Sequence, residues 1–155
     1  MSDRRFTRDE LLSETRIFYS EEWQVRLQDV DAAGIVFFAR ILEACHDVYI
    51  NFWQKQGPDF KEGFQTFRFL APIVHAEADY LKPLRFLDDV QIQIIKIDIY
   101  DKKYILGYRL VEKKQQQVVA VAQIVHVFVD AVSFQRTLIP IEIKMALQKR
   151  MEQAS

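Results

Sequence analysis

Two acidic residues, Asp29 and Asp31, stand directly ahead of a stretch whose apolar residues recur at helical spacing. The N-terminal end of a helix carries partial positive charge and N–H groups without intrahelical partners, so a carboxylate held there is ionised near neutral pH. The same N–H groups could stabilise an oxyanion. This combination suits attack on an acyl carbon, with the carboxylate acting either as nucleophile or as general base on water.

Asp31 is the candidate catalytic residue. Gly34 would let the backbone approach a ligand closely, and Phe37 and Phe38 would present N–H groups of the first helical turn. The competing interpretation is structural, because aspartate at such positions more often caps a helix or closes an Asx-turn, and Asp29 or Asp31 could do either. An Asp-x-Asp pair could also bind a metal, but no further ligand follows at useful spacing, so we expect neither metal nor other cofactor.

The three histidines each have a functional and a structural interpretation. His46 lies about two turns into the predicted helix, at the edge of its apolar face, where a half-buried imidazole bonded to a neighbour is the commoner arrangement. His75 shares one face of a predicted strand with Glu77 and the apolar Ile73, which favours the lip of a pocket over a solvated edge. We therefore expect His46 and His75 in a substrate pocket. His126 stands among apolar residues and is expected to be a core histidine whose polar atoms are satisfied by hydrogen bonds.

One long helix and five strands would position these candidates. The helix is predicted from the three-four spacing of its apolar residues, which are Phe38, Ile41, Leu42, Cys45, Val48, Tyr49, Phe52 and Trp53. Alternation and turn residues predict strands over 22–28, 68–81, 90–100, 104–112 and 118–129, and a loop over 57–63. Pro72 predicts that the second strand lies at a sheet edge or is bent there. A change of apolar parity at Ile94 predicts a β-bulge in the third.

The expected fold class is α+β, with a five-stranded antiparallel sheet wrapped around one helix in a single domain. Residues 1–20 are predicted to form an N-terminal arm, either loose or as a short helix laid on the surface. Residues 21–135 are predicted to form the domain, and 136–155 a C-terminal tail that could be helical. The fifth strand is apolar on both parities, so both of its faces must be covered. The helix would cover one face, and either residues 138–151 or another subunit would cover the other.

Composition excludes several classes of function. A net charge of −1 over 155 residues provides no basic field for nucleic acid. Cys45 is the single cysteine, which excludes an intrachain disulfide and a thiolate metal cluster. Neither a Gly-x-Ser-x-Gly elbow nor a glycine-rich phosphate loop occurs. The charged N-terminus lacks a signal-peptide core and no run is long enough to span a membrane, so a soluble cytoplasmic protein with no membrane partner is expected.

Residues 29–38, with the sequence DVDAAGIVFF, resemble the signature of the 4-hydroxybenzoyl-CoA thioesterase family of hot-dog proteins, and the element order is similar over about residues 22–130. The resemblance implies a thioester hydrolase in which Asp31 is the catalytic carboxylate and the N–H near Phe38 polarises the thioester carbonyl. It also implies a dimer whose sheets join edge to edge, with active sites at the interface, often paired again into a tetramer. Ala39-Arg40 is a departure, since an Asn-Tyr or similar pair often follows the two aromatic residues in this family.

A narrower likeness concerns the substrate. Residues 45–49 and 72–76, followed by Tyr80 and Pro83, resemble segments of the 1,4-dihydroxy-2-naphthoyl-CoA hydrolases of phylloquinone (vitamin K1) synthesis. This implies an aromatic acyl-CoA substrate. The alternatives are a thioesterase for short or medium aliphatic acyl-CoA and a hot-dog module that binds acyl-CoA without hydrolysis. A hot-dog dehydratase would need a histidine ahead of the helix, and none stands between Glu22 and Phe38.

Overall fold

The computed structural model describes residues 4–154. Residues 1–3 of the predicted arm and Ser155 of the predicted tail lie outside the described residues. The elements are α1 (Arg8–Ser13), β1 (Tyr19–Gln24), a 3-10 turn (Leu27–Asp29), α2 (Phe38–Lys55), α3 (Pro58–Gln65), β2 (Ile73–Tyr80), β3 (Asp89–Ile99), β4 (Lys103–Glu112), β5 (Gln117–Val127) and α4 (Ile141–Glu152). Within the described part of the chain, no helix combines the length and the apolar character needed to cross a membrane.

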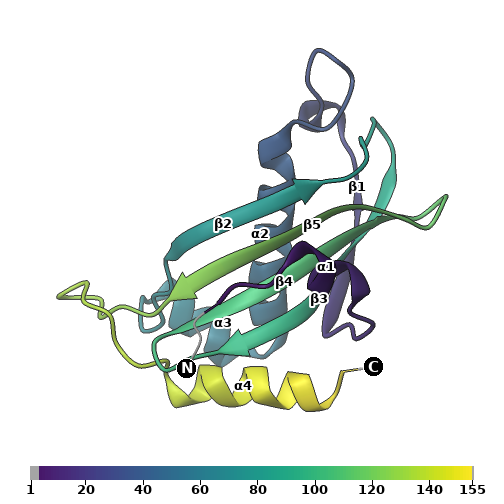
Figure 1. The fold of residues 1–155 in the computed structure, drawn as a ribbon. Coiled ribbons are helices and arrows are strands. Elements are labelled where there is room, and N and C mark those ends of the chain that lie inside the picture. Colours follow the sequence, from purple (N-terminus) through teal and green to yellow (C-terminus); the bar gives the residue numbers. More distant parts are fainter. Residues whose placement is uncertain (1–3, 155) are drawn as a thin grey trace.

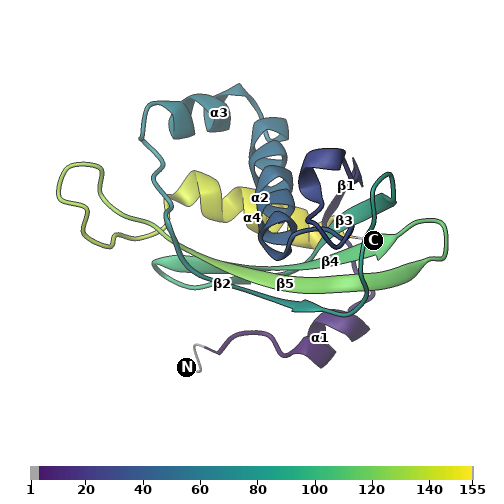
Figure 2. The ribbon, with the colours of Figure 1, turned by 90° about the horizontal axis from the view of Figure 1, so that it is seen from above.

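The five strands form one antiparallel sheet in the order β1-β3-β4-β5-β2, and the sheet curves around α2 (Figures 1 and 2). This confirms the expected α+β class and the hot-dog architecture. The register of β3 against β4 shifts between Ile94 and Lys96, so the bulge predicted from the change of parity is confirmed. The strand that follows Pro72, β2, lies at an edge of the sheet, as the proline predicts.

The apolar face of α2 packs on the inner face of the sheet. Its buried side chains are Ile41, Ala44, Cys45, Val48, Tyr49, Phe52 and Trp53, and they belong to the main core cluster together with residues of β3, β4 and β5. Burial of each large side chain stabilises the fold by about 1.5–3 kcal/mol. This packing fixes the helix on the sheet and thereby fixes the loop that precedes it.

Two local predictions are corrected. The first strand was expected at 22–28, but it spans Tyr19–Gln24 and a 3-10 turn follows, because the Asp29 carboxylate accepts the Arg26 N–H and closes that turn. The segment 57–63 was expected to be a loop, yet most of it lies in α3. Pro58 occupies the start of this helix, where its missing N–H costs nothing, and the Phe60 ring packs 5.4 Å from that of Trp53.

The cover of the second sheet face is also corrected. Figure 2 shows α4 on the same side of the sheet as α2, and Ile143 and Leu147 of α4 join the main core. The opposite face, hereafter the outer face, is covered instead by the N-terminal arm, whose Phe6 and Leu11 are buried there. The sequence did not reveal this role because the apolar residues of the arm are isolated and follow neither helical nor strand spacing.

Candidate active site

The loop ahead of α2 is anchored by Asp29, whose side chain is 1% exposed. One carboxylate oxygen accepts the Arg26 N–H at 2.8 Å, the other accepts Arg26 Nη2 at 3.1 Å, and Arg40 Nε lies 3.7 Å away. Burial alone would raise the pKa of Asp29, but the hydrogen bonds from Arg26 and the charges of both arginines outweigh it and lower the pKa. Asp29 is therefore an ionised structural residue.

Asp31 stands two residues later in a different environment. Its Oδ1 accepts the Ala33 N–H at 2.8 Å, which is the Asx-turn of the structural interpretation. The backbone closes the same turn, with Gly34 N–H donating to the Asp31 carbonyl at 3.0 Å and Gly34 at φ +79°, where a residue with a Cβ would be strained. Within residues 4–154, Oδ2 of Asp31 has no hydrogen-bond partner. The turn therefore uses one oxygen and leaves the other available.

No side chain among residues 4–154 caps the N-terminus of α2. Of the three backbone groups expected to face an oxyanion, two are already used, because Phe37 N–H donates to the Asp29 carbonyl and Gly34 N–H to the Asp31 carbonyl. The N–H groups of Phe38 and Ala39, by contrast, find no acceptor among the described residues. The open donors of the first turn are thus Phe38, as expected, and Ala39, which the sequence analysis did not identify.

Asp31 and the first turn of α2 line one cavity of about 440 Å³. Its other walls are the end of β2, the segment that follows it, and β5, with Ile35, Val36, Ile41, Leu81, Pro83, Leu84, Val119 and Ala120 as the apolar lining. Lys82 contributes a cation and Tyr80 a hydroxyl that donates to the Phe38 carbonyl at 2.9 Å. A carboxylate, unpaired N–H groups and apolar walls together suit the hydrolysis of an acyl group.

Tyr80 was missing from the predicted site. Its contact with Phe38 joins residues 42 positions apart, and no local pattern relates the two. Among residues 4–154, no three His, Cys, Asp or Glu side chains gather so that they could hold a metal ion.

His46 lines a second hollow, of about 420 Å³, with Tyr49, Ile50, Phe64, Phe67, Phe69, Leu70, Ala71, Pro72 and Ile73. Its Nδ1 is buried and has no partner among the described residues. The His46 ring stacks at 5.6 Å on Tyr49, which stacks at 4.1 Å on His126. His126 is fully buried, and burial lowers its pKa to about 4. It lies in the core as predicted, with Nδ1 3.1 Å from the Ala71 carbonyl oxygen, but its Nε2 has no partner among the described residues, so it is not fully satisfied.

His75 lies away from both hollows, contrary to expectation. The β2–β5 pairing shifts between Ile73 and His75, so Ile73 pairs with His126 on the inner face while His75 pairs with Val125, a residue of the outer-face cluster. The expectation that Ile73 and His75 share a face does not hold, because strict alternation fails across a bulge. The Nε2 of His75 lies 3.6 Å from the carboxylate of Glu77 instead.

Comparison with known proteins identifies the family of this chain. The model of the thioesterase-like superfamily matches residues 25–147. The 1,4-dihydroxy-2-naphthoyl-CoA hydrolase of Rippkaea orientalis is 34% identical over 114 residues, covering 73% of this chain and 83% of the relative. That of Nostoc punctiforme is 35% identical over 130 residues, covering 84% and 86%.

A solved structure of a thioesterase has a similar fold. Slr0204, a 1,4-dihydroxy-2-naphthoyl-CoA thioesterase from Synechocystis, superposes with a TM-score of 0.76 at 25% identity, covering 83% of this chain and 94% of its own. The matched region contains Asp31, α2 and all of the sheet except β1. The chain therefore belongs to the thioesterase-like superfamily of hot-dog proteins, in which 1,4-dihydroxy-2-naphthoyl-CoA hydrolases are among its relatives.

Proposed function

We propose that this protein is an acyl-CoA thioesterase that hydrolyses 1,4-dihydroxy-2-naphthoyl-CoA to 1,4-dihydroxy-2-naphthoate and CoA, a reaction of phylloquinone synthesis. The observation that carries the proposal is the shared cavity, into which the Asp31 carboxylate and the uncapped N-terminus of α2 both open. The named activity of the relatives supports the choice of acyl group.

In this mechanism the thioester carbonyl oxygen lies against the N–H groups of Phe38 and Ala39, which stabilise the oxyanion as it forms. Asp31 either takes a proton from water as the water adds to the carbonyl carbon, or adds to that carbon itself and is released by water in a second step. In both routes the C–S bond breaks and CoA leaves as a thiol after gaining a proton. The ammonium of Lys82 would pair with a phosphate of CoA at the cavity wall.

The site is completed by a second copy of the chain. Among the described residues β2 pairs only with β5, so its other edge offers unpaired backbone groups. A second β2 can add there antiparallel about a two-fold axis. Pairing along the whole strand sets Ile73 of one copy opposite Tyr80 of the other. The hollow of His46, which Ile73 lines, then adjoins the Asp31 cavity of the neighbouring copy.

This arrangement gives the acyl group an aromatic pocket. Phe64 and Phe67 line the hollow and offer aromatic surface to a naphthoyl group, and the unpartnered Nδ1 of His46 can bond a ring hydroxyl after a small rotation. The substitution His46→Leu should therefore raise KM for the dihydroxynaphthoyl thioester by roughly 5- to 150-fold and leave that for a fatty acyl-CoA unchanged, since an unmatched polar contact is worth about 1–3 kcal/mol. Equal changes for both substrates would remove His46 from substrate recognition.

Thiol release measured with 1,4-dihydroxy-2-naphthoyl-CoA, benzoyl-CoA and a fatty acyl-CoA tests the proposal directly. We expect the highest kcat/KM for the dihydroxynaphthoyl thioester. A preference for the fatty acyl-CoA would assign the protein to aliphatic thioesters, and binding of all three without thiol release would make it an acyl-CoA-binding module. Sedimentation of the full chain should give a dimer or a multiple of it, and a charge on the β2 edge, Val74→Lys, should give a monomer with reduced turnover.

A further inference from the structure

The N-terminal arm, defined here as residues 4–17, crosses the outer face of the sheet. Figure 2 shows α1 on this side of the sheet and α2, α3 and α4 on the other. The arm lies outside the region that the superfamily model matches, which begins at residue 25. The strand β1 lies outside this region as well. The contacts of the arm show how the sheet holds it.

The centre of the outer face is shaped for two apolar side chains. Phe6 and Leu11, 6% and 2% exposed, pack with Ile95, Ile105, Val121 and Val125. Gly107 lies below them in β4, and a Cβ at this position would stand 2.6 Å from the Leu11 Cδ2 and 3.2 Å from the Phe6 Cδ2. A glycine in the middle of a strand weakens that strand, so here the missing side chain provides the space into which Leu11 fits.

Polar side chains of the sheet hold the backbone of the arm. Gln123, 3% exposed, accepts the Phe6 N–H at 2.9 Å and donates to the Phe6 carbonyl at 2.7 Å, as a neighbouring strand would. Arg109 donates to the carbonyls of Glu14 and Leu12 at the other end of the arm. Both side chains bond backbone atoms, so the outer face holds the arm on either side of its contact through Leu11, at Phe6 ahead of α1 and at the C-terminal end of α1.

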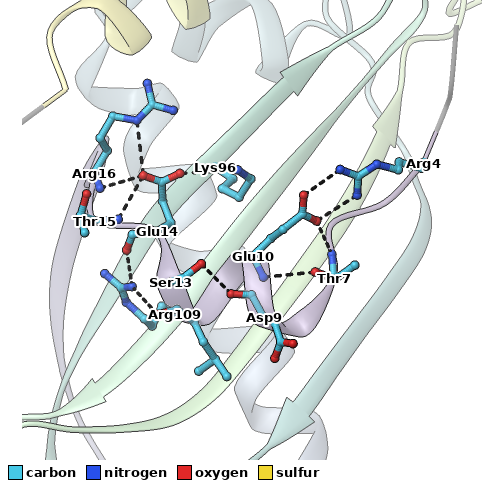
Figure 3. A network of polar contacts seen from close by, with 11 residues as sticks. Arg4, Thr7, Asp9, Glu10, Ser13, Glu14, Thr15, Arg16, Lys96 and Arg109 are labelled. Carbon is cyan, nitrogen blue, oxygen red and sulfur yellow. Dashed lines mark hydrogen bonds and ion pairs between the residues drawn. The ribbon is translucent and has the colours of Figure 1, made fainter.

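Within the arm, polar contacts fix the short helix (Figure 3). Thr7 and Glu10 form a capping box, and Arg4 bonds the Glu10 carboxylate at 2.7 Å. The hydrogen bond from Arg4 and that from the Thr7 N–H hold the pKa of Glu10 at about 2. Glu14 accepts the Arg16 N–H at 3.0 Å and pairs with Lys96 of β3 at 3.5 Å.

We propose that the outer face is a peptide-binding site whose occupant is the chain's own arm, and that this occupancy keeps the face from pairing with the same face of a second copy. Without the arm, the apolar residues of three adjacent strands would lie open, and contiguous apolar patches of this kind mark association surfaces. The exposed face is also suited to a copy of itself, because the Gln123 amide, which now bonds the Phe6 backbone through both its oxygen and its nitrogen, could pair with Gln123 of a second copy across a two-fold axis.

The test uses the full chain with the arm expelled. Leu11→Asp places a charge in the apolar centre, and we expect rapid proteolytic cleavage of the arm and a doubling of the mass measured by light scattering. A synthetic peptide of residues 1–17 with the native sequence should bind this variant one to one and restore the original mass. Arg8→Asp introduces the same side chain on the exposed side of α1 and should behave as wild type.

A second variant displaces the arm through a substitution in the sheet instead of in the arm. Gly107→Val fills the space of Leu11 while adding a residue that favours strands, so a protein that is folded by circular dichroism should again lose arm protection and double its mass, and the peptide should fail to bind. An unchanged mass in a variant whose arm is cleaved freely would overturn the blocking role. A mass increase that the peptide does not reverse in Leu11→Asp would overturn the binding site. Thioester hydrolysis is read separately, since Asp31 lies on the other side of the sheet.

Discussion

Asp29 and Asp31 belong to one short motif, yet their surroundings are opposite. Asp29 is 1% exposed and bonded to Arg26 through both oxygens, whereas Asp31 is exposed in the single chain, uses one oxygen in a turn, and lines a cavity. The two residues are of the same type and lie only two positions apart in the sequence. What separates a structural carboxylate from a candidate catalytic one is the number of satisfied oxygens and the presence of an open space beside it.

The comparison also explains why the pair is needed. The Asp29 carbonyl accepts the Phe37 N–H, and its carboxylate holds Arg26 and Arg40 on either side of the loop. These contacts fix the backbone immediately before α2, and so fix where Asp31 and the first-turn N–H groups lie relative to each other. Substitution of Asp31 should therefore mainly reduce turnover, and substitution of Asp29 should mainly reduce the free energy of unfolding.

The largest effect is expected for Asp31→Asn, which keeps the oxygen that accepts the Ala33 N–H but removes the charge. A general base contributes ~10²–10⁴-fold to a rate, so kcat/KM for thioester hydrolysis should fall by that factor. The free energy of unfolding, measured with urea, should stay within about 0.5 kcal/mol of wild type, as for other exposed sites. Near-normal turnover in this variant would refute the catalytic assignment.

Asp29→Asn should reverse the pattern. The amide still accepts one N–H, but the two arginines lose their buried counter-charge, and hydrogen bonds to charged groups are worth about 1.5–3 kcal/mol. Because Arg26 is 58% exposed and can be hydrated, we expect a loss of about 1–2 kcal/mol in the free energy of unfolding. Turnover should fall less than in Asp31→Asn. A variant as stable as wild type would show that Asp29 does not anchor the loop.

The pH dependence of stability provides a further test of the role of Asp29. The folded pKa of Asp29 is lowered, so its contribution to stability is fully present above the unfolded value of about 3.9 and is lost as the pH falls through the folded pKa. The difference in unfolding free energy between wild type and Asp29→Asn should thus be constant near neutral pH and shrink below about pH 4. The pKa of Glu10 is also lowered, so its contribution to stability is likewise lost as the pH falls. Glu10 is present in both proteins, and its contribution therefore cancels in the difference. A gap that stays constant down to acid unfolding would contradict this.

The sequence predicted the features that depend on local spacing and missed those that depend on contacts between distant residues. The helix at Phe38, the bulge at Ile94 and the edge position of β2 were predictable because each depends on spacing or on one proline. The residues before α2 were predictable as a carboxylate at a helix N-terminus. The side on which the arm packs depends on Gly107 and Gln123, which lie about a hundred residues away, and no periodicity encodes such a contact.

The face of His75 shows a subtler limit. A bulge was predicted where the apolar parity of β3 changes, but the bulge in β2 between Ile73 and His75 leaves no such sign, because β2 is an edge strand with mixed residues on both faces. For this reason His75 does not line the candidate site, although the sequence analysis expected it there. The same bulge reverses the alternation for the rest of β2, so Tyr80 pairs with Ala120 and lies on the inner face of the sheet.

The smallest effect is expected for Tyr80→Phe, which isolates one contact of the Asp31 region. The Tyr80 hydroxyl donates to the Phe38 carbonyl at 2.9 Å, and that carbonyl shares its peptide group with the Ala39 N–H, one of the two open donors. Donation to the carbonyl polarises the peptide and orients its N–H toward the cavity. Phenylalanine keeps the ring in the cavity wall and removes only this bond, whose net value of about 0.5–1.5 kcal/mol corresponds to a roughly 2- to 12-fold change.

The loss should appear in kcat and leave KM nearly constant, because the oxyanion develops only in the transition state. Stability should change little, since Tyr80 is 50% exposed. The double variant Tyr80→Phe with Asp31→Asn separates two explanations. If the hydroxyl acts through the oxyanion donors, the two losses add on a logarithmic scale, because the donors work on the carbonyl whether or not the carboxylate is charged. If Tyr80 instead positions Asp31, its removal should cost nothing once the charge is gone.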